Sequence, residues 1–189
     1  MKKQLIIALC LIVTTGAYAQ HDHSKMDHSK HSRMEDSFTV SKDFQVQLNQ
    51  VFTATKGLTE SFIDGNSKDV SKEAGKVKSV LTKVDMKLLT SKEAHMSWMM
   101  NLKEMNTALD KLSGSTEIDA QKKEYAKFND ALYKSIKSFG LGGNTAYYQH
   151  CPMALDNQGG YWLSQDKEIR NPYLGSKMLK CGSTKETLN

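Results

Sequence analysis

Hydrophobic residues recur at helical spacing from about residue 40 to residue 139 of the 189-residue chain. In the first such segment the apolar positions lie three, four or seven residues apart, and the segment stops at the turn-forming run Asp64-Gly65-Asn66. The apolar positions are Val40, Phe44, Leu48, Val51, Phe52, Leu58, Phe62 and Ile63. This pattern predicts an amphipathic helix that ends near Asp64.

Three more amphipathic helices are predicted after the first. The second is expected over residues 67–88, where valine, alanine and leucine recur on one face. The third begins after Ser91, a suitable N-cap, and stops at residues 113–115. The fourth is expected over residues 117–139, and the glycines that follow terminate it.

Helices joined by short polar turns are typical of an antiparallel up-and-down bundle. The chain shows no alternating strand pattern of useful length. We therefore predict an all-α fold, an antiparallel up-and-down four-helix bundle on which an irregular C-terminal segment carrying aromatic, cysteine and methionine residues is packed. Trp162 and Tyr161 are expected to hold that segment on one end of the bundle.

Composition divides the chain into four parts. Residues 1–19 are expected to be a signal peptide, and residues 20–37 a disordered tail rich in histidine and methionine. Residues 38–143 are the predicted helical bundle. Residues 144–189, which hold both prolines, are expected to be a C-terminal metal-binding segment of the same domain.

The N-terminus has the features of an export signal. Lys2 and Lys3 precede the apolar run Leu5–Val13, and Ala17-Tyr18-Ala19 fits the site that signal peptidase cleaves. The apolar run is too short to span a bilayer, so we expect a periplasmic protein whose mature chain does not insert into a membrane. Loss of the two lysines lowers the formal net charge from +5 to +3, which is too small and too dispersed to indicate nucleic-acid binding.

The predicted tail has a composition typical of loose metal capture. Its candidate ligands are His21, His23, Met26, His28, His31 and Met34. Imidazoles bind Cu(II) and thioethers bind Cu(I), so such a tract can collect copper. The competing interpretation is a solvated linker whose histidines have no role.

The C-terminal segment carries two sulfur-containing pairs. Pro152 favours an extended conformation at Cys151, so Cys151 and Met153 are expected to project to the same side. Met178 and Cys181 lie three residues apart, a spacing that places them on one face of a helical turn. Four sulfur atoms converge if the loop between the pairs folds back.

Thiolate and thioether ligands select Cu(I) over hard cations, and His150 offers an imidazole beside them. Copper is therefore the expected ion, with silver and zinc as the other candidates, although structural zinc sites seldom use thioethers. The alternative is a disulfide between Cys151 and Cys181. Such a bond would close a loop of about 30 residues and stabilise the fold by about 3 to 4 kcal/mol in the chain-entropy model.

A further candidate pair of ligands lies on the third predicted helix. His95 and Met99 are four residues apart, as are Met96 and Met100, so each pair shares a helix face. Methionines at helical spacing more often fill a core, and a single histidine near a helix start is more often structural. Both interpretations stay open for His95 and Met99.

The sequence gives little support to an enzyme. His150 adjoins Cys151, but adjacent residues of an extended strand point to opposite faces, which is unsuitable for a nucleophile and its base. The chain lacks Cys-x-x-Cys, a phosphate-binding loop and a nucleophile elbow. We therefore predict a protein without enzymatic activity.

The C-terminal motifs carry a resemblance to a known family. They are residues 147–154 (YYQHCPMA), 160–164 (GYWLS), 168–173 (EIRNPY) and 175–182 (GSKMLKCG). These motifs resemble those of an uncharacterised exported domain family whose members occur alone or fused to periplasmic adaptor subunits of copper/silver efflux systems. The chain departs from the commonest pattern at Leu174, where an aromatic residue is usual, and at Gly159-Gly160.

The resemblance implies a metal-handling role in the cell envelope. Together with the sulfur ligands it leads to the hypothesis of a periplasmic heavy-metal-binding protein, with Cu(I) as the expected ion, that acts in copper buffering, delivery or efflux. A periplasmic efflux adaptor is the protein partner that the resemblance implies. The alternative hypothesis is a disulfide-stapled helical interaction domain of the cell envelope with no metal role.

Overall fold

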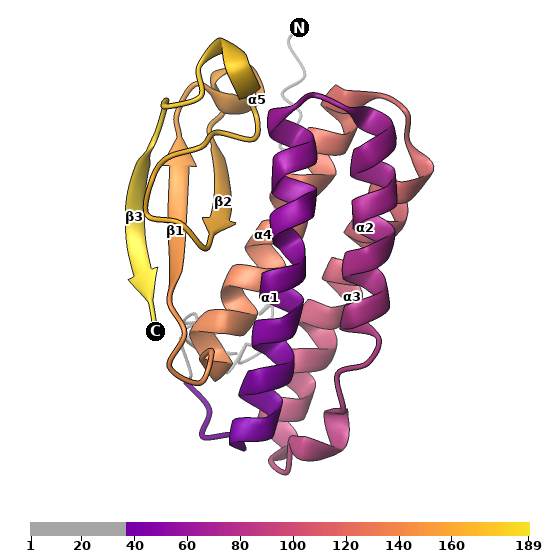
Figure 1. Ribbon diagram of the computed structural model, residues 1–189. Helices are drawn as coiled ribbons and strands as arrows, with labels where there is room; N and C mark the ends of the chain where they lie inside the picture. The colour runs from indigo at the N-terminus through magenta and orange to yellow at the C-terminus, as the bar shows by residue number, and fades with distance from the viewer. Residues whose placement is uncertain (1–36) are drawn as a thin grey trace, which may run out of the picture. The chain divides into compact units, whose positions relative to one another are not determined.

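The computed structural model describes residues 37–189, so the predicted signal peptide and the tail histidines and methionines that are predicted to capture metal lie outside the described residues. Four long helices come first and a small sheet follows (Figure 1). The helices are α1 (Lys42–Ile63), α2 (Ser67–Leu81), α3 (Lys92–Gly114) and α4 (Ile118–Phe139). The strands are β1 (Ala146–Cys151), β2 (Gly160–Ser164) and β3 (Ser183–Leu188). Short helical segments are η2 (Met86–Leu88), α5 (Ala154–Asn157) and η3 (Gly175–Lys177).

Polar caps fix the starts of the first three long helices. The Ser41 hydroxyl accepts from the Phe44 amide, and the Asn66 side chain accepts from two amides of the first turn of α2. Ser91 caps α3 by accepting from the Ala94 amide at 3.1 Å, as predicted. Each cap satisfies amides that have no partner within the helix.

The second helix is shorter than predicted, because α2 ends at Leu81 instead of continuing to residue 88. The chain turns after Leu81, and the Asp85 carboxylate accepts from the Lys87 amide to start the separate η2 turn. The Asp85 amide donates to the Gln47 side chain on α1 at 2.7 Å. Asp85 therefore caps a separate turn in a stretch whose apolar pattern predicts a continuing helix, since a local side-chain hydrogen bond competes with the helical one.

The four long helices lie side by side (Figure 1), and each contacts the next one along the chain. Near the start of α1 their core is aromatic. The Trp98 ring lies 5.2 Å from the Phe44 ring and 6.1 Å from the Phe139 ring, in edge-on geometry in both cases. All three side chains are buried, so apolar burial holds this end together.

The prediction of an irregular C-terminal segment is wrong, because this segment forms a three-stranded antiparallel sheet in the order β2-β1-β3. A bulge between Tyr148 and Gln149 interrupts the alternation of β1. Consecutive Trp162 and Leu163 are both buried in β2, while β3 is an edge strand of mainly polar residues. β1 and β2 therefore lack the regular two-residue alternation by which a half-buried strand is found in sequence, and β3 alternates in exposure but not in apolar residues.

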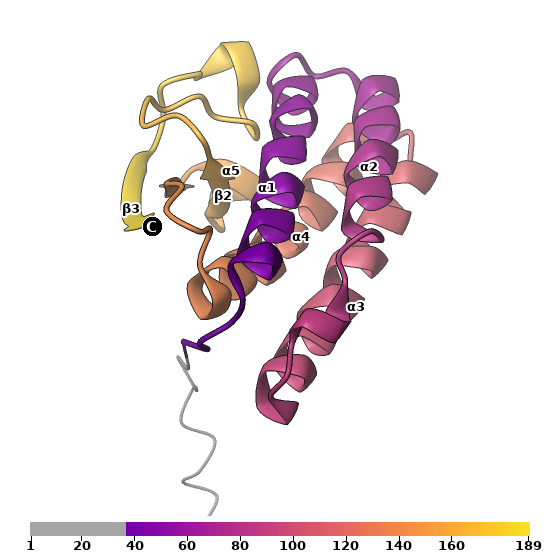
Figure 2. The same ribbon diagram turned by 60° about the horizontal axis from the view of Figure 1, so that its bottom comes forward.

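The sheet packs on α4 through β2, and Figure 2 shows it on one side of the helices. Asn129 of α4 accepts from the Leu163 amide at 2.9 Å, which satisfies a donor on the free edge of β2. The Gln165 side chain donates to two carbonyls of α1. Tyr133 of α4 donates to the Glu186 carboxylate of β3 at 2.6 Å. Polar contacts thus set the position of the sheet on an apolar interface.

Within residues 37–189, the helices are too short or too polar to cross a membrane.

Replacement of Trp162 should loosen the sheet from the helices. The side chain is fully buried, so Trp162→Ala should lower the free energy of unfolding by about 3 kcal/mol or more. Tyr161→Ala is the matched control at the neighbouring position. The Tyr161 side chain is 41% exposed, so its removal should cost only about 1 kcal/mol of ring stacking. Denaturant titration followed by circular dichroism measures both. Equal losses for the two variants would contradict the burial argument.

Candidate functional site

Cys151 and Cys181 meet at one end of the sheet. Cys151 is the last residue of β1 and is fully buried, whereas Cys181 lies just before β3 and is half-buried. Antiparallel pairing places His150 of β1 opposite Ser183 of β3, which brings the adjoining cysteines alongside each other. Their Sγ atoms are 2.8 Å apart. The structure thus brings together the two thiols that sequence analysis had placed 30 residues apart.

Gly182 makes this approach sterically feasible. Its φ is +136°, a conformation that favours glycine, and it sits where the two strands come closest. A Cβ at this position would lie 2.8 Å from the His150 carbonyl oxygen and 3.0 Å from the Trp162 ring. The glycine that follows Cys181 is therefore required by close packing.

Asn171 organises the loop that carries Cys181. Its Nδ2 donates to the Cys181 carbonyl at 2.8 Å, and its Oδ1 accepts from the amides of Tyr173 and Leu174. Its own amide donates to the Leu179 carbonyl at 2.8 Å. The side chain is fully buried, so these hydrogen bonds replace its contacts with water. Sequence analysis missed this role, although an Asn-Pro dipeptide is a known turn signal.

Contact with Cys151 favours the protonated form of Cys181. The hydrogen bond between the two thiols raises the pKa of the Cys181 thiol, and burial and the nearby Cys151 charge raise it further. Two sulfurs in contact cannot both be ionised without repulsion. Cys181 is therefore a thiol, and not a thiolate, over a wider pH range than an isolated cysteine.

Met153 and Met178 flank the cysteines, but their backbones differ from the prediction. Met153 has helical angles (φ −85°, ψ −8°), so the extended geometry that would align it with Cys151 ends at Pro152. Met178 ends the η3 turn, and its carbonyl accepts from the Cys181 amide at 3.0 Å in a turn. Their side chains are 46% and 42% exposed. Both thioethers are accessible from solvent, in contrast to the buried Cys151 thiol.

His150 does not join the thiol pair. Its ring lies 4.1 Å from the Tyr161 ring, and the stack continues through Tyr148 to Tyr133 of α4. Adjacent strand residues face opposite sides, so His150 lies on the other face of β1 from Cys151. Burial, and then the Lys185 charge, lower the pKa of His150. Within residues 37–189, no three His, Cys, Asp or Glu side chains gather in a group that could hold a metal ion.

The candidate ligands of α3 lie on a different surface of the protein from the two cysteines. His95 is half-buried, while Met96, Met99 and Met100 are 56%, 42% and 66% exposed. The interpretation of these methionines as core residues is therefore wrong. Met105, further along the helix, is the fully buried one.

This surface lies at the opposite end of α1 from the cysteine loop. Trp98 near the start of α3 packs on Phe44 at the start of α1, whereas Gly175 of the cysteine loop lies against the Ile63 carbonyl at the end of α1. Phe44 and Ile63 are about 28 Å apart at the helical rise of 1.5 Å per residue. His95 and Met99 therefore cannot share an ion with Cys151 and Cys181.

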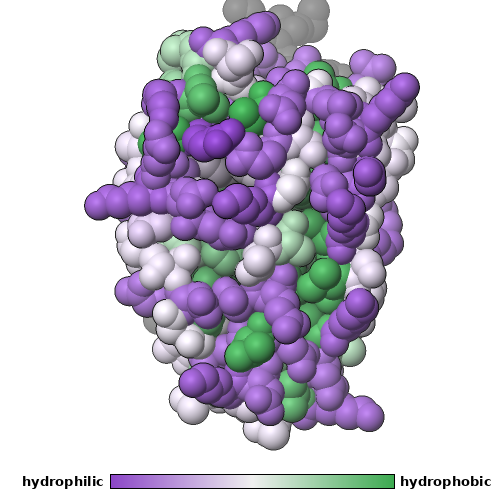
Figure 3. Space-filling view, in the orientation of Figure 1, coloured by the Kyte–Doolittle hydropathy of each residue, from purple (hydrophilic) through white to green (hydrophobic). Residues whose placement is uncertain are grey.

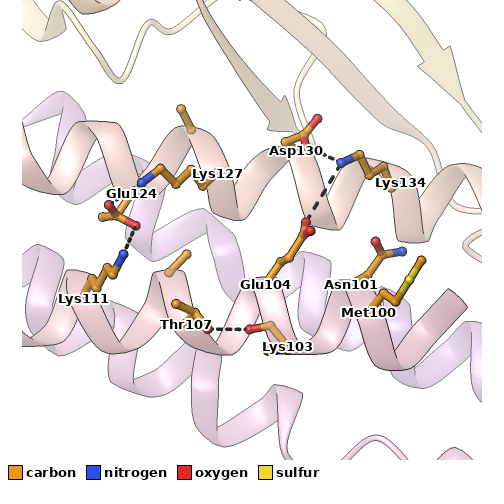
Figure 4. A pocket seen from close by; sticks show the side chains of 12 residues that line it. Met100, Asn101, Lys103, Glu104, Thr107, Lys111, Glu124, Lys127, Asp130 and Lys134 are labelled. Carbon is orange, nitrogen blue, oxygen red and sulfur yellow. Dashed lines mark hydrogen bonds and ion pairs between the residues drawn. The ribbon is translucent and has the colours of Figure 1, made fainter. Parts of the chain in front are cut away.

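A groove of about 950 Å³ lies between α3 and α4 (Figure 4). Charged side chains of both signs line it. Lys111 pairs with Glu124, and Lys134 pairs with both Asp130 and Glu104. Each of the three carboxylates of the groove is thus engaged by a lysine, so the groove has no carboxylate set aside for a cation.

Comparison with known proteins covers the helical part only. Residues 51–144 match the model of a family described as a protein of unknown function (DUF3347). The match begins within α1 and ends just before β1, so the two cysteines and the sheet lie outside it. Neither a curated protein nor a solved structure matches the chain.

Gly182→Ala should separate the two thiols. The added Cβ would collide with the β1 backbone and the Trp162 ring, so Cys181 must move away from Cys151. We expect slower disulfide formation under a mild oxidant, measured by quantifying free thiols over time. Gly143→Ala is the control, because Gly143 also has positive φ (+94°) but open space around its Cβ position. Equal oxidation rates in the two variants would contradict the steric role of Gly182.

Proposed function

We propose that this chain binds a soft heavy-metal ion, in the first place Cu(I), through the thiolates of Cys151 and Cys181. It acts in copper buffering, delivery or efflux in the periplasm, and it is not an enzyme. The single observation that carries this proposal is the 2.8 Å approach of the two sulfurs on a folded scaffold. A preorganised pair of donors binds without the ordering cost of a flexible chain.

The pair is close to metal-binding geometry. With metal–sulfur bonds of about 2.3 Å, two sulfurs on one ion lie about 3.8 Å apart at a tetrahedral angle and about 4.6 Å apart in a linear arrangement. Binding therefore requires the sulfurs to separate by about 1 to 2 Å. Cys151 is fixed in β1, so Cys181, which is half-buried and follows a turn, is the residue that moves.

The available donors favour Cu(I) or Ag(I) over zinc. Two thiolates with accessible thioethers nearby form a soft ligand set. Structural zinc sites are closed by four ligands, nearly always cysteine and histidine. The described chain offers two cysteines at the site, and His150 lies on the other face of β1. Met153 and Met178 are the auxiliary ligands in this proposal.

The C-terminal motifs support the cellular setting of the proposal. They resemble an exported family that is also found fused to efflux adaptors, so a periplasmic adaptor is the proposed protein partner. The N-terminal sequence supports export through a cleaved signal peptide. Transfer to a partner also requires accessible ligands, and the exposed methionines beside the thiol pair meet that requirement.

The same sulfur contact favours a second function, that of a disulfide-stapled interaction domain. A disulfide has an S–S distance of about 2.05 Å, so a small movement would close the bond in an oxidising compartment. Counting free thiols in protein purified from the periplasm and denatured without reductant separates the two. Thiols that are free, or protected only by metal, support metal binding, whereas their complete absence supports the staple.

Replacement of the cysteines should have a larger effect than replacement of the methionines. Cys151→Ser or Cys181→Ser should abolish tight Cu(I) binding near neutral pH, because thiolates are charged and donate more strongly than thioethers. Met153→Leu and Met178→Leu should weaken binding only partly. Anaerobic Cu(I) titration against a competing chelator measures each affinity. A Cys151→Ser variant that keeps parental affinity but melts several degrees lower would support the staple.

Affinity should also fall as pH falls. Each thiol must release its proton to bind, so below the thiol pKa values the apparent affinity should drop by up to about tenfold per pH unit for each proton displaced. The pKa of Cys181 is raised, so this dependence should begin at higher pH than for an ordinary cysteine. The same titration repeated from pH 9 to pH 6 measures the slope. A flat profile would point to thioether ligands alone.

Deletion of residues 20–34 should lower the number of bound ions but leave the tightest site intact. A flexible tract must be ordered on binding, so its sites should be weaker than the thiol pair. Parallel titrations of the two chains give the stoichiometry and the highest affinity. Loss of the tight site on deletion would place the main ligands in the tail.

A further inference from the structure

Methionine is distributed unusually over the surface of the helices and sheet. Of the seven large hydrophobic residues that are exposed in the described chain, five are methionines. These are Met96, Met99, Met100, Met153 and Met178, and the other two are Val46 and Tyr161. Methionine is ordinarily among the more buried residue types. An exposed methionine side chain gains little from apolar packing. A property of methionine other than its hydrophobicity therefore accounts for its presence at these positions.

Three of the five lie within one turn and a half of α3. Met96 and Met100 are four residues apart, Met96 and Met99 three, so neighbouring members of the group are about 5 to 6 Å apart at Cβ. Residue His95 lies one turn before Met99 and on the same side of the helix. The long, unbranched methionine side chain can bring sulfurs at this spacing onto a common point.

The opposite side of the same turn is fixed in the core. Trp98 is fully buried between the Phe44 and Phe139 rings, and Ala94 is buried one turn earlier. The helix backbone under the methionines is therefore held rigidly, while their side chains are free to rearrange. A rigid backbone with adaptable donors is a suitable support for a metal ion.

We propose that Met96, Met99 and Met100 of α3, with the His95 imidazole, form a second soft-metal site that takes Cu(I) or Ag(I). Thioether and imidazole donors suit soft monovalent ions. The site lies at the other end of α1 from the cysteines, so it loads independently. Its choice of ion rests on the proposed function, but its ligands do not include either thiol.

A protein-docking surface is the competing explanation for exposed methionines, and the pattern of exposure disfavours it. Docking surfaces are enriched in aromatic residues and arginine as well as methionine. In the described chain five of the seven exposed large hydrophobics are methionines, and Tyr161 is the single aromatic among them. On the face shown in Figure 3, hydrophobic residues are exposed in small areas separated by hydrophilic ones. A requirement for sulfur atoms, and not for apolar contact area, explains why methionines occupy these exposed positions.

The test is a silver titration of the full chain followed at individual methionines. Protein labelled with ¹³C at the methionine ε-methyl groups is titrated with silver nitrate in chloride-free buffer, because Ag(I) needs no reductant. We expect the signals of Met96, Met99 and Met100 to shift together, along with the His95 ring signal, and to saturate over one equivalent of Ag(I) added after the thiol pair has filled. Met105, buried on the same helix, is the internal control and should not shift.

Two variants test the assignment. Met96→Leu/Met99→Leu/Met100→Leu should bind one Ag(I) equivalent fewer than the parent, with an unchanged melting temperature because these side chains are exposed. Met153→Leu/Met178→Leu is the matched control, since it removes the other exposed thioethers and should leave the α3 shifts intact. Retention of the full stoichiometry by the triple variant overturns the proposal.

The result separates this site from the thiol site. Shifts at α3 in protein whose cysteines form a disulfide would support the thioether site and defeat the proposed thiol function. Unmoved α3 signals in protein that binds metal tightly through its cysteines would support the thiol function and defeat the thioether site. Unmoved α3 signals that broaden as the protein concentration rises, together with self-association of the parent that the triple variant lacks, would overturn the metal site in favour of a protein contact.

Discussion

A continuous series of aromatic contacts joins the helices to the sheet, and the position of the cysteine loop depends on it. The series runs from Phe62 through Tyr125 and Tyr173 to Trp162, with ring centroids 4.5, 5.8 and 6.1 Å apart. Tyr173 is the central member because it comes from the loop itself. Its hydroxyl donates to the Tyr161 carbonyl at 2.5 Å, so the loop is tied both to β2 and to the core of the helices.

Burial of this series also explains the ionisation of its tyrosines. Desolvation raises the pKa of Tyr125 to about 12 and that of Tyr173 well above its ordinary value, so both remain neutral donors at any physiological pH. The loop is therefore held by contacts that do not change with pH. The titratable groups closest to the site are the thiols themselves, His150 of β1, and the Glu168 carboxylate that pairs with Lys180 beside Cys181.

The sequence predicted the helices well and the sheet poorly, for physical reasons. The four helices have one buried face each, and caps such as Ser91 mark where they begin. The sheet was missed because the bulge in β1 breaks alternation and because β2 is buried on both sides at Trp162 and Leu163. Convergence of Cys151 and Cys181 could be anticipated from the sequence, but its geometry could not, since it depends on the close approach of Gly182 to β1 and on the hydrogen bonds of the buried Asn171.

The two kinds of sulfur donor occupy environments that suit their chemistry. In an oxidising compartment an accessible pair of thiols is converted to a disulfide unless a metal holds it, and Cys151 is accordingly buried while Cys181 is only half-buried. Thioethers cannot form disulfides, so the methionines can be fully accessible without that risk. Under the proposed function, the redox state of the thiol pair would decide how much metal the chain retains, because oxidation removes the strong donors and leaves the weak ones. The arrangement would then hold metal tightly only while the thiols are occupied or reduced.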